Sequence, residues 1–169
     1  MERILVHLPA YREPELVPTI KDALKNATYP ERLVFGICRQ YNPEDGFDNL
    51  DEYRKDKRFK ILDIPYSESK GVCWARNLTQ QLYNGETYTM QIDSHMRFVQ
   101  DWDVLVLEDY KQALETSKKP IISTYCTPFD PKSEESTWIP TPCLMSQYEF
   151  SGDRLLMSMP WYIQDYKSR

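Results

Sequence analysis

Residues 4–38 read ILVHLPAYREPELVPTIKDALKNATYPERLVFGIC, in which two short apolar runs flank a longer amphipathic stretch. The runs at residues 4–8 and 33–38 have the length of buried strands, and Pro9 is expected to end the first. Between them, apolar residues recur at helical spacing, which predicts a helix that begins near Pro14, because proline is favoured in the first helical turn. A strand, a helix and a second strand in this order predict a parallel pair joined by a right-handed crossover.

The same alternation continues along the chain. Apolar runs predict further strands at residues 59–64, 87–92 and 121–124, and helical spacing predicts helices over residues 71–83 and 102–117. Five strands with intervening helices predict an α/β fold, with a mainly parallel sheet covered by helices on both faces. All strands then end at one edge of the sheet, and the ligands of such folds bind outside that edge.

The composition is that of an ordinary globular protein, with 169 residues, of which 41% are apolar and 28% charged. The net charge of −5, without a basic tract, argues against a nucleic-acid-binding surface. No apolar run reaches the roughly 18 residues of a membrane span and no signal peptide is evident, so we expect a cytoplasmic protein. The 4 cysteines form no CxxC pair, and we expect them to be reduced and mostly buried.

The pattern changes after residue 127, where prolines and aromatic residues become frequent. We therefore expect residues 1–127 to form the α/β domain. Residues 128–169 are expected to form a less regular segment with antiparallel strands, such as one at residues 154–159. Aromatic side chains that are exposed in this segment would favour self-association.

Asp93 and His95 stand directly after the predicted strand at residues 87–92. In extended backbone, residues i and i+2 share a face, so the two side chains are expected to point to one spot. A carboxylate oxygen and an imidazole nitrogen form part of a coordination shell for Mn²⁺ or Mg²⁺, and the imidazole favours Mn²⁺. Water and ligand phosphate oxygens would complete that shell. A strand-terminal turn with a solvated histidine is the alternative explanation for the same two residues.

Asp101-Trp102-Asp103 matches the metal-binding pattern DxD by letter. It precedes a predicted helix, however, where acidic residues serve as the N-cap and as first-turn partners of the helix dipole. We therefore assign these two acids a structural role. His7 lies inside the first predicted strand and is interpreted as a core or sheet-edge histidine.

Four stretches of the chain, in this order, resemble glycosyltransferases of the GT-A type, which bind a nucleotide-sugar with a divalent cation. The stretches are VHLPAYREPELVPTIKDALKNATYP, LVFGICRQYNPED, SKGVCWARNLTQQLY and YTMQIDSHMRFVQDWD. The chain is most similar to the cytosolic polypeptide N-acetylglucosaminyltransferases that modify hydroxyproline in a ubiquitin-ligase subunit, and to their bacterial and viral relatives. The resemblance covers about residues 1–130. It implies a GT-A, Rossmann-like fold that comprises the donor-binding half of a transferase, truncated on the acceptor side.

The resemblance also implies a set of residues that bind a UDP-sugar. Uridine and ribose are expected at Pro9, Ala10, Tyr11, Arg12 and Glu13, and the base pocket is expected to be closed by Arg39 and Gln40. The diphosphate and sugar are expected near Lys70, Gly71, Arg76 and Asn77, and the metal-binding DxD variant corresponds to Asp93, Ser94 and His95. Several of these residues have structural alternatives: Tyr11 as a surface aromatic, Arg39 and Arg76 as ion-pair residues, and Lys70-Gly71 as an ordinary loop-to-helix junction.

The implied reaction is transfer of a hexose, with N-acetylglucosamine as the candidate sugar, from uridine diphosphate to a hydroxyl acceptor on a protein or glycan. A divalent ion stabilises the charge that grows on the diphosphate, and the family likeness implies a retaining outcome. Full-length relatives continue into an acceptor region with a Gly-Glu-Glu-like stretch and a later histidine ligand. Glu134-Glu135 lacks the glycine, and the only histidines are His7 and His95. We therefore assign no catalytic base.

Two other classes of function fit parts of the sequence. A non-catalytic nucleotide-sugar-binding or interaction module would keep the same fold, and the missing acceptor features favour it. A nucleotidyltransferase would share the alternating sheet but needs a glycine-rich loop after the first strand. That place reads PAYREPE, without a glycine, so this alternative ranks last.

Overall fold

The computed structural model describes residues 2–124, 126, 129–132, 143–150 and 156–162. The chain divides into two compact units, Met1–Glu108 and Asp109–Arg169. Helix α3 (Trp102–Leu114) begins in the first unit and ends in the second. The predicted boundary between residues 127 and 128 stays a prediction.

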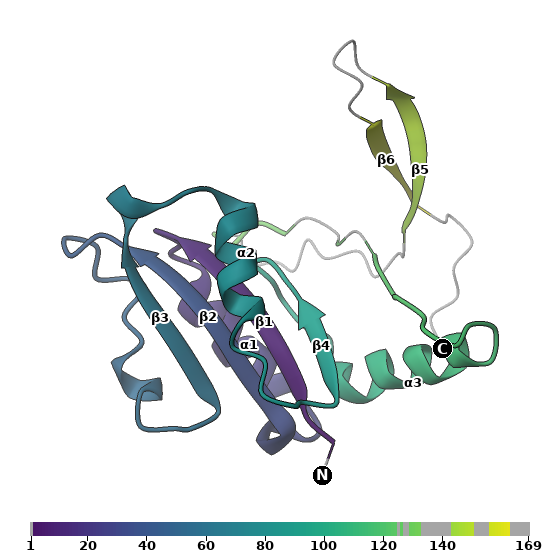
Figure 1. Ribbon diagram of the computed structural model, residues 1–169, viewed down its shortest axis with the longest axis horizontal. Coiled ribbons are helices and arrows are strands. Elements are labelled where there is room, and N and C mark those ends of the chain that lie inside the picture. Colours follow the sequence, from purple (N-terminus) through teal and green to yellow (C-terminus); the bar gives the residue numbers. More distant parts are fainter. Residues whose placement is uncertain (1, 125, 127–128, 133–142, 151–155, 163–169) are drawn as a thin grey trace. The chain divides into compact units, whose positions relative to one another are not determined.

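The first unit contains a four-stranded sheet in which every neighbouring pair of strands is parallel. Its strands are β1 (Ile4–Tyr11), β2 (Leu33–Tyr41), β3 (Phe59–Pro65) and β4 (Tyr88–Gln91), in the spatial order β3-β2-β1-β4. Helices α1 (Leu16–Asn26) and α2 (Val72–Gln80) cover opposite faces of this sheet (Figure 1). The predicted Rossmann-like α/β fold, with a mainly parallel sheet and helices on both faces, is confirmed.

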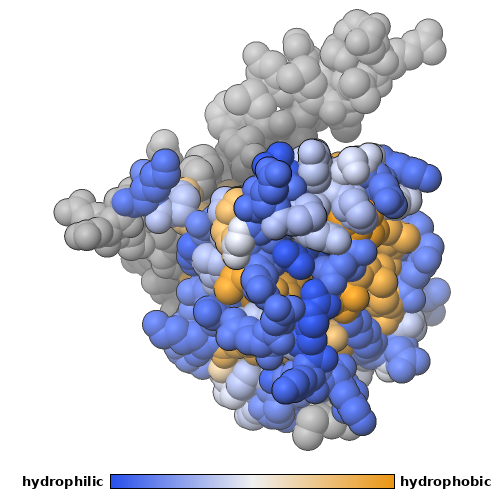
Figure 2. All heavy atoms as spheres, turned by 90° about the vertical axis from the view of Figure 1, so that its left-hand side faces the viewer, coloured by the Kyte–Doolittle hydropathy of each residue, from blue (hydrophilic) through white to orange (hydrophobic). Residues whose placement is uncertain are grey.

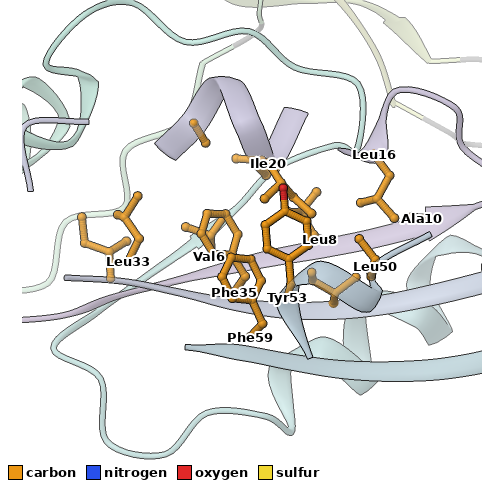
Figure 3. Packing of buried hydrophobic residues seen from close by; sticks show 14 of the residues in the cluster. Val6, Leu8, Ala10, Leu16, Ile20, Leu33, Phe35, Leu50, Tyr53 and Phe59 are labelled. Atoms are coloured by element: carbon orange, nitrogen blue, oxygen red, sulfur yellow. The ribbon is translucent and has the colours of Figure 1, made fainter. Parts of the chain in front are cut away.

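The main hydrophobic core lies between the sheet and α1 (Figure 3). Val6, Leu8 and Ala10 contribute alternate side chains from β1, and Leu16 and Ile20 face them from α1. Because successive residues of a strand point to opposite faces, the other residues of β1 face α2. This alternation decides which strand-end side chains can share one site.

Strand β2 follows the same rule in register with β1. Phe35 and Ile37 belong to the core on the α1 side, and Phe35 stacks on Phe59 of β3 with ring centroids 4.9 Å apart. By alternation, Arg39 also lies on the α1 face, whereas Gln40 lies on the α2 face.

The structure departs from the predicted strands most clearly at the end of β1 and at residues 121–124. Strand β1 does not end at Pro9 but continues to Tyr11 in register with β2. The backbone groups of His7 and Pro9 point to the same side of β1, toward β4. Proline is tolerated there because β4 pairs with β1 only as far as His7, so no partner strand needs an N–H from Pro9. Residues 121–124 form no strand, and Ile121 is 93% exposed. An apolar run becomes a strand only where a neighbouring strand supplies hydrogen-bond partners.

Strand β3 forms one edge of the sheet, and its outer surface is charged. Figure 2 views the molecule from this side and shows mostly hydrophilic residues, with smaller hydrophobic areas between them. Lys60 of β3 donates to Leu82 O (2.8 Å) and to the Glu86 carboxylate (2.5 Å), which ties the edge strand to the segment after α2. Charges on an edge strand discourage pairing with another chain.

The second unit contains an antiparallel hairpin of β5 (Cys143–Phe150) and β6 (Leu156–Tyr162). The predicted antiparallel strand at residues 154–159 is therefore found from Leu156 onward, and its first two residues lie outside the described part of the chain. Glu134-Glu135 also lies outside it. Self-association through the aromatic residues of this segment stays a prediction.

The cysteines differ from expectation in their burial. Cys38 of β2 is buried, and burial raises the pKa of its thiol to about 11. Cys73 and Cys126 are exposed, so the prediction of mostly buried cysteines is wrong for the described residues. Among those residues, no helix combines the length and hydrophobicity that crossing a bilayer requires.

Candidate functional site

A cavity of about 570 Å³ opens at the carboxyl ends of the central strands, on the face that α2 covers. It lies where ligands of parallel α/β sheets bind. Its lining comes from the ends of β1 and β2, the β3–α2 connection and the start of α2: Pro9, Tyr11, Gln40, Tyr66, Ser67, Ser69, Gly71 and Val72.

A chain of hydrogen bonds fixes the inner wall of this cavity. The buried Gln40 amide donates from Nε2 to Ala10 O (3.2 Å) and accepts from Ser69 Oγ at its Oε1 (2.5 Å). Ser69 Oγ in turn accepts the backbone N–H of Gly71 (3.3 Å). The ends of β1 and β2 and the start of α2 are thereby linked, and a ligand in the cavity meets an amide of fixed orientation.

The first residues of α2 supply a second feature of the cavity. Gly71 precedes the helix with φ 90°, a left-handed conformation that favours glycine. The helix has no side-chain N-cap, so its first N–H groups are available to a ligand, and the helix N-terminus favours an anion. The ammonium of Lys70 lies 5.9 Å from the ring centre of Trp74. This arrangement suits the predicted approach of Lys70 and Gly71 to phosphate groups.

Arg39 and Gln40 do not share a site, although both were predicted to close one pocket. Gln40 lines the cavity, whereas Arg39 is paired with Asp48 (2.7 Å) and Asp63 (3.3 Å) on the other face. Asp48 is only 1% exposed, so the Arg39 guanidinium neutralises a buried carboxylate. The ion-pair interpretation accounts for the contacts of Arg39.

The side chains at the end of β1 and just after it also have different surroundings. The Ala10 side chain belongs to the core, while Tyr11 is largely exposed at the cavity. Arg12 pairs with Asp45, and Glu13 accepts the backbone N–H of Glu15 (3.0 Å) at one carboxylate oxygen. Of the predicted uridine-binding loop, only Pro9 and Tyr11 line the cavity.

Asp93 and His95 are both exposed, by 55% and 56% of their side chains. Asp93 accepts from Arg76 of α2 (3.2 Å), and His95 Nδ1 lies 3.2 Å from a carboxylate oxygen of Glu13. Between them Ser94 is buried, and its carbonyl accepts from Thr19 Oγ1 (3.0 Å). The segment bends at Ser94 and His95, so the extended backbone assumed from the sequence is not present.

These residues fit a divalent cation in part. In the described part of the chain, no three His, Cys, Asp or Glu side chains come together as a metal site would require. If Nδ1 of His95 donates to Glu13, Nε2 remains as a donor atom, which is how metal-binding histidines are oriented by a carboxylate. Asp93 and His95 could therefore supply two ligands, and a phosphate-bearing ligand would supply others. Asn77 of α2 accepts a hydrogen bond from Gln81, the residue that follows the helix (2.9 Å).

Asp101 and Asp103 have the predicted structural role but not the predicted partners. Asp103 is 3% exposed and accepts the backbone N–H groups of Thr28 (2.8 Å) and Tyr29 (2.9 Å). Asp101 accepts from Thr28 Oγ1 (2.6 Å). Both acids therefore satisfy polar groups beyond the end of α1, rather than capping α3 with their side chains. His7 is buried in β1, and burial lowers its pKa, which confirms its interpretation as a core histidine.

Four residues that line the cavity were not among the predicted binding residues: Tyr66, Ser67, Ser69 and Val72. Asp45, the partner of Arg12, was not predicted either. Tyr66 and Ser69 follow β3, and the placement of all strand ends at one edge was the signal that could have identified them. Asp45 lies in the loop after β2, and nothing in the local sequence indicates that it pairs with Arg12.

Comparison with known proteins identifies the family of this chain. A family model described as Glycosyltransferase (GlcNAc) matches residues 3–58 and 46–161. No curated protein sequence matches at a significant level. Among solved structures, the crystal structure of S. aureus TarS is similar, with 13% sequence identity and a TM-score of 0.49. That match covers 68% of this chain and 20% of the TarS chain, so this chain spans about a fifth of the length of that relative.

Proposed function

This chain belongs to the glycosyltransferase (GlcNAc) family, and from that premise we propose that it binds a UDP-sugar with a divalent cation and transfers the sugar to a hydroxyl acceptor. The observation that supports the proposal best is the placement of the cavity. It opens at the carboxyl edge of the sheet and is lined by two tyrosines and by the start of α2. Asp93 and His95 follow β4 at the same edge, where a cation would meet the phosphates.

We assign the uridine to the part of the cavity between the ends of β1 and β2, where Tyr11 and Tyr66 offer aromatic rings and Gln40 offers a fixed amide. The diphosphate is assigned to the start of α2, where Gly71 and the first helical N–H groups favour an anion. This arrangement keeps the uncharged base apart from the charged groups.

The chemistry follows from the charge that the leaving group develops. As the glycosidic bond breaks, negative charge grows on the diphosphate, and Arg76 and Lys70 can stabilise it with charge-assisted hydrogen bonds. A bound Mn²⁺ or Mg²⁺ would act as a Lewis acid on the same oxygens. Asp93 and His95 would hold that ion, and Glu13 would orient the imidazole of His95.

The finer parts of the proposal rest on the sequence resemblance. N-acetylglucosamine is the candidate sugar, and the candidate acceptor is a hydroxyl on a protein, with hydroxyproline the specific case that the resemblance implies. A glycan hydroxyl is the other acceptor class. A cytoplasmic location remains part of the proposal.

A second candidate function is a non-catalytic nucleotide-sugar-binding module of the same fold. One observation favours it: Asp93 already pairs with Arg76, and the described residues bring no third metal ligand to it. In that case the arginine would take the place of the cation and would contact the diphosphate directly.

Calorimetric titration of UDP with and without Mn²⁺ tests the main proposal. We expect Mn²⁺ to be required for tight binding and the Asp93→Ala variant to lose that requirement together with the affinity. Asp101→Asn is the matched control, because it changes an exposed acid outside the cavity and should bind like the unmodified chain. Equal binding with and without Mn²⁺ would support the second candidate, and no binding in either condition would exclude both.

A further inference from the structure

Arg12 is the point at which three strand-end segments meet. Its backbone N–H donates to Gln40 O (2.9 Å), which extends the pairing of β1 with β2 by one residue. Its φ is 44°, a left-handed conformation that non-glycine residues adopt rarely and often at functional sites. The guanidinium is thereby directed away from the line of the strand.

The guanidinium makes two further contacts. Its Nε and one terminal nitrogen donate to the two carboxylate oxygens of Asp45, at 2.7 and 3.3 Å. Its central carbon lies 5.0 Å from the ring centre of Tyr66. Asp45 belongs to the loop after β2, and Tyr66 follows β3 and lines the cavity. Arg12 therefore connects the loop after β2 to one wall of the cavity.

We propose that Arg12 and Asp45 are positioning residues that hold Tyr66 in place as a wall of the nucleotide cavity, and that Arg12 does not bind the anionic groups of the donor. This inference rests on the proposed function. The two N–H groups that face Asp45 are occupied by its carboxylate, which also neutralises the guanidinium charge, and the central guanidinium carbon lies over the Tyr66 ring.

The two possible roles of Arg12 predict opposite effects for a change at Asp45. If Arg12 bound phosphate, Asp45→Asn would remove a competing negative charge and would strengthen the binding of an anionic nucleotide. If the pair positions Tyr66, the same change loosens the cavity wall and weakens binding, because a preformed site loses its organisation.

The test measures UDP affinity by calorimetry and amide hydrogen exchange in the ligand-free protein. For Asp45→Asn we expect about fivefold weaker UDP binding and faster exchange over residues 66–71, which include the Ser69 N–H that donates to Tyr66 O. Arg12→Lys should weaken binding to a similar extent, because lysine cannot make the bidentate contact and stack on the ring. The double variant should be no weaker than either single one, since the two residues act together.

Two controls separate positioning from general damage. Asp45→Glu keeps the carboxylate and should restore affinity to within about twofold of the unmodified chain. Glu52→Gln removes one negative charge from an exposed ion pair with Lys21 that does not line the cavity, and it should change neither readout.

Unchanged or stronger UDP binding in Asp45→Asn would overturn the proposal. Unchanged exchange over residues 66–71 would overturn it as well, whether or not UDP binds. If the unmodified chain does not bind UDP at all, the proposed function fails. The exchange data then decide alone whether Asp45 holds Tyr66 in place.

Discussion

Two triplets that begin with aspartate follow β4, and their side chains have different surroundings in the structure. In Asp93-Ser94-His95, the two outer side chains are exposed near the start of α1, where His95 meets Glu13. Asp101-Trp102-Asp103 is packed at the end of α1, where Asp103 is buried and Trp102 Nε1 donates to Ala23 O (2.8 Å). The comparison shows that the letters of a DxD-like motif do not reveal whether its side chains are exposed or have a structural role, whereas their position along the neighbouring helix does.

The segment between the triplets runs along α1 from its start to its end. Arg97 pairs with Glu15 (2.5 Å), and the Phe98 N–H donates to Asp22 (2.6 Å). The Asp101 N–H then donates to Asn26 O (2.7 Å). The helix thus fixes both triplets, and only the first remains beside the carboxyl edge of the sheet.

The sharpest test of this contrast is Asp103→Ala. The substitution leaves the Thr28 and Tyr29 N–H groups without their charged acceptor, and we expect the free energy of unfolding to fall by about 3 kcal/mol. Urea denaturation followed by circular dichroism measures this loss. Asp103→Asn, which keeps one acceptor oxygen, should lose less. A loss below about 1 kcal/mol for the alanine variant would mean that the Asp103 carboxylate does not have the structural role that its hydrogen bonds indicate.

Asp93→Ala should show the opposite pattern. Its exposed pair with Arg76 is worth little, so the free energy of unfolding should stay within about 0.5 kcal/mol of the unmodified chain. UDP affinity in the presence of Mn²⁺ should fall about 100-fold if Asp93 supplies a metal ligand. Denaturation and calorimetry on the same preparation give both values. A large loss of stability in Asp93→Ala would mean that the first triplet has a structural role like the second, which would contradict the contrast between them.

Thr19→Val tests whether α1 holds the first triplet in place. The Thr19 hydroxyl is buried, donates to Ser94 O and accepts the Met96 N–H (2.9 Å), so its loss leaves both groups unpaired. We expect the free energy of unfolding to fall by about 1.5 kcal/mol and Mn²⁺-dependent UDP affinity to fall several-fold. Thr19→Ser keeps the hydroxyl and serves as the control. If affinity is unchanged when stability falls, the bend at Ser94 does not orient the neighbouring side chains.

The sequence was sufficient for those parts of the fold that depend on local patterns. Strand and helix alternate as the apolar spacing predicts, because each element must bury one face against its neighbour. The wrong strand at residues 121–124 shows the limit of that reasoning, since an apolar run alone does not specify a pairing partner. The face on which each strand side chain lies could also be derived, because side chains alternate along a strand. Phe35 and Ile37 point to the core on the α1 face, so Arg39 points to that face as well.

The candidate site was less predictable because its contacts join distant loops. Gln40 and Tyr11 were predicted from the family resemblance, and both line the cavity. The contact of Arg12 with Asp45 depends on loop conformations that no periodicity encodes. Likewise, the Asp103 carboxylate turns back to Thr28 because the chain has run the length of α1, which the local sequence does not reveal.

The smallest expected effect is a pH dependence of the free energy of unfolding that comes from Asp101 in the second triplet. Hydrogen bonds from Thr28 and then Gln100 hold the pKa of Asp101 below its usual range in the folded protein. The ionised form therefore favours folding, and its contribution is complete above the pKa of the unfolded chain and is lost as the pH falls through the folded pKa. Asp101→Asn keeps an acceptor for Thr28 but removes the charge, so its urea midpoint should lie below that of the unmodified chain at pH 7. The two midpoints should draw closer as the pH falls from 7 toward about 3, because Asp101 begins to be protonated and every other carboxyl group is common to both proteins. A gap of constant size between these pH values would show that the Asp101 charge does not contribute to folding. The structural role of the second triplet would then depend on Asp103 alone.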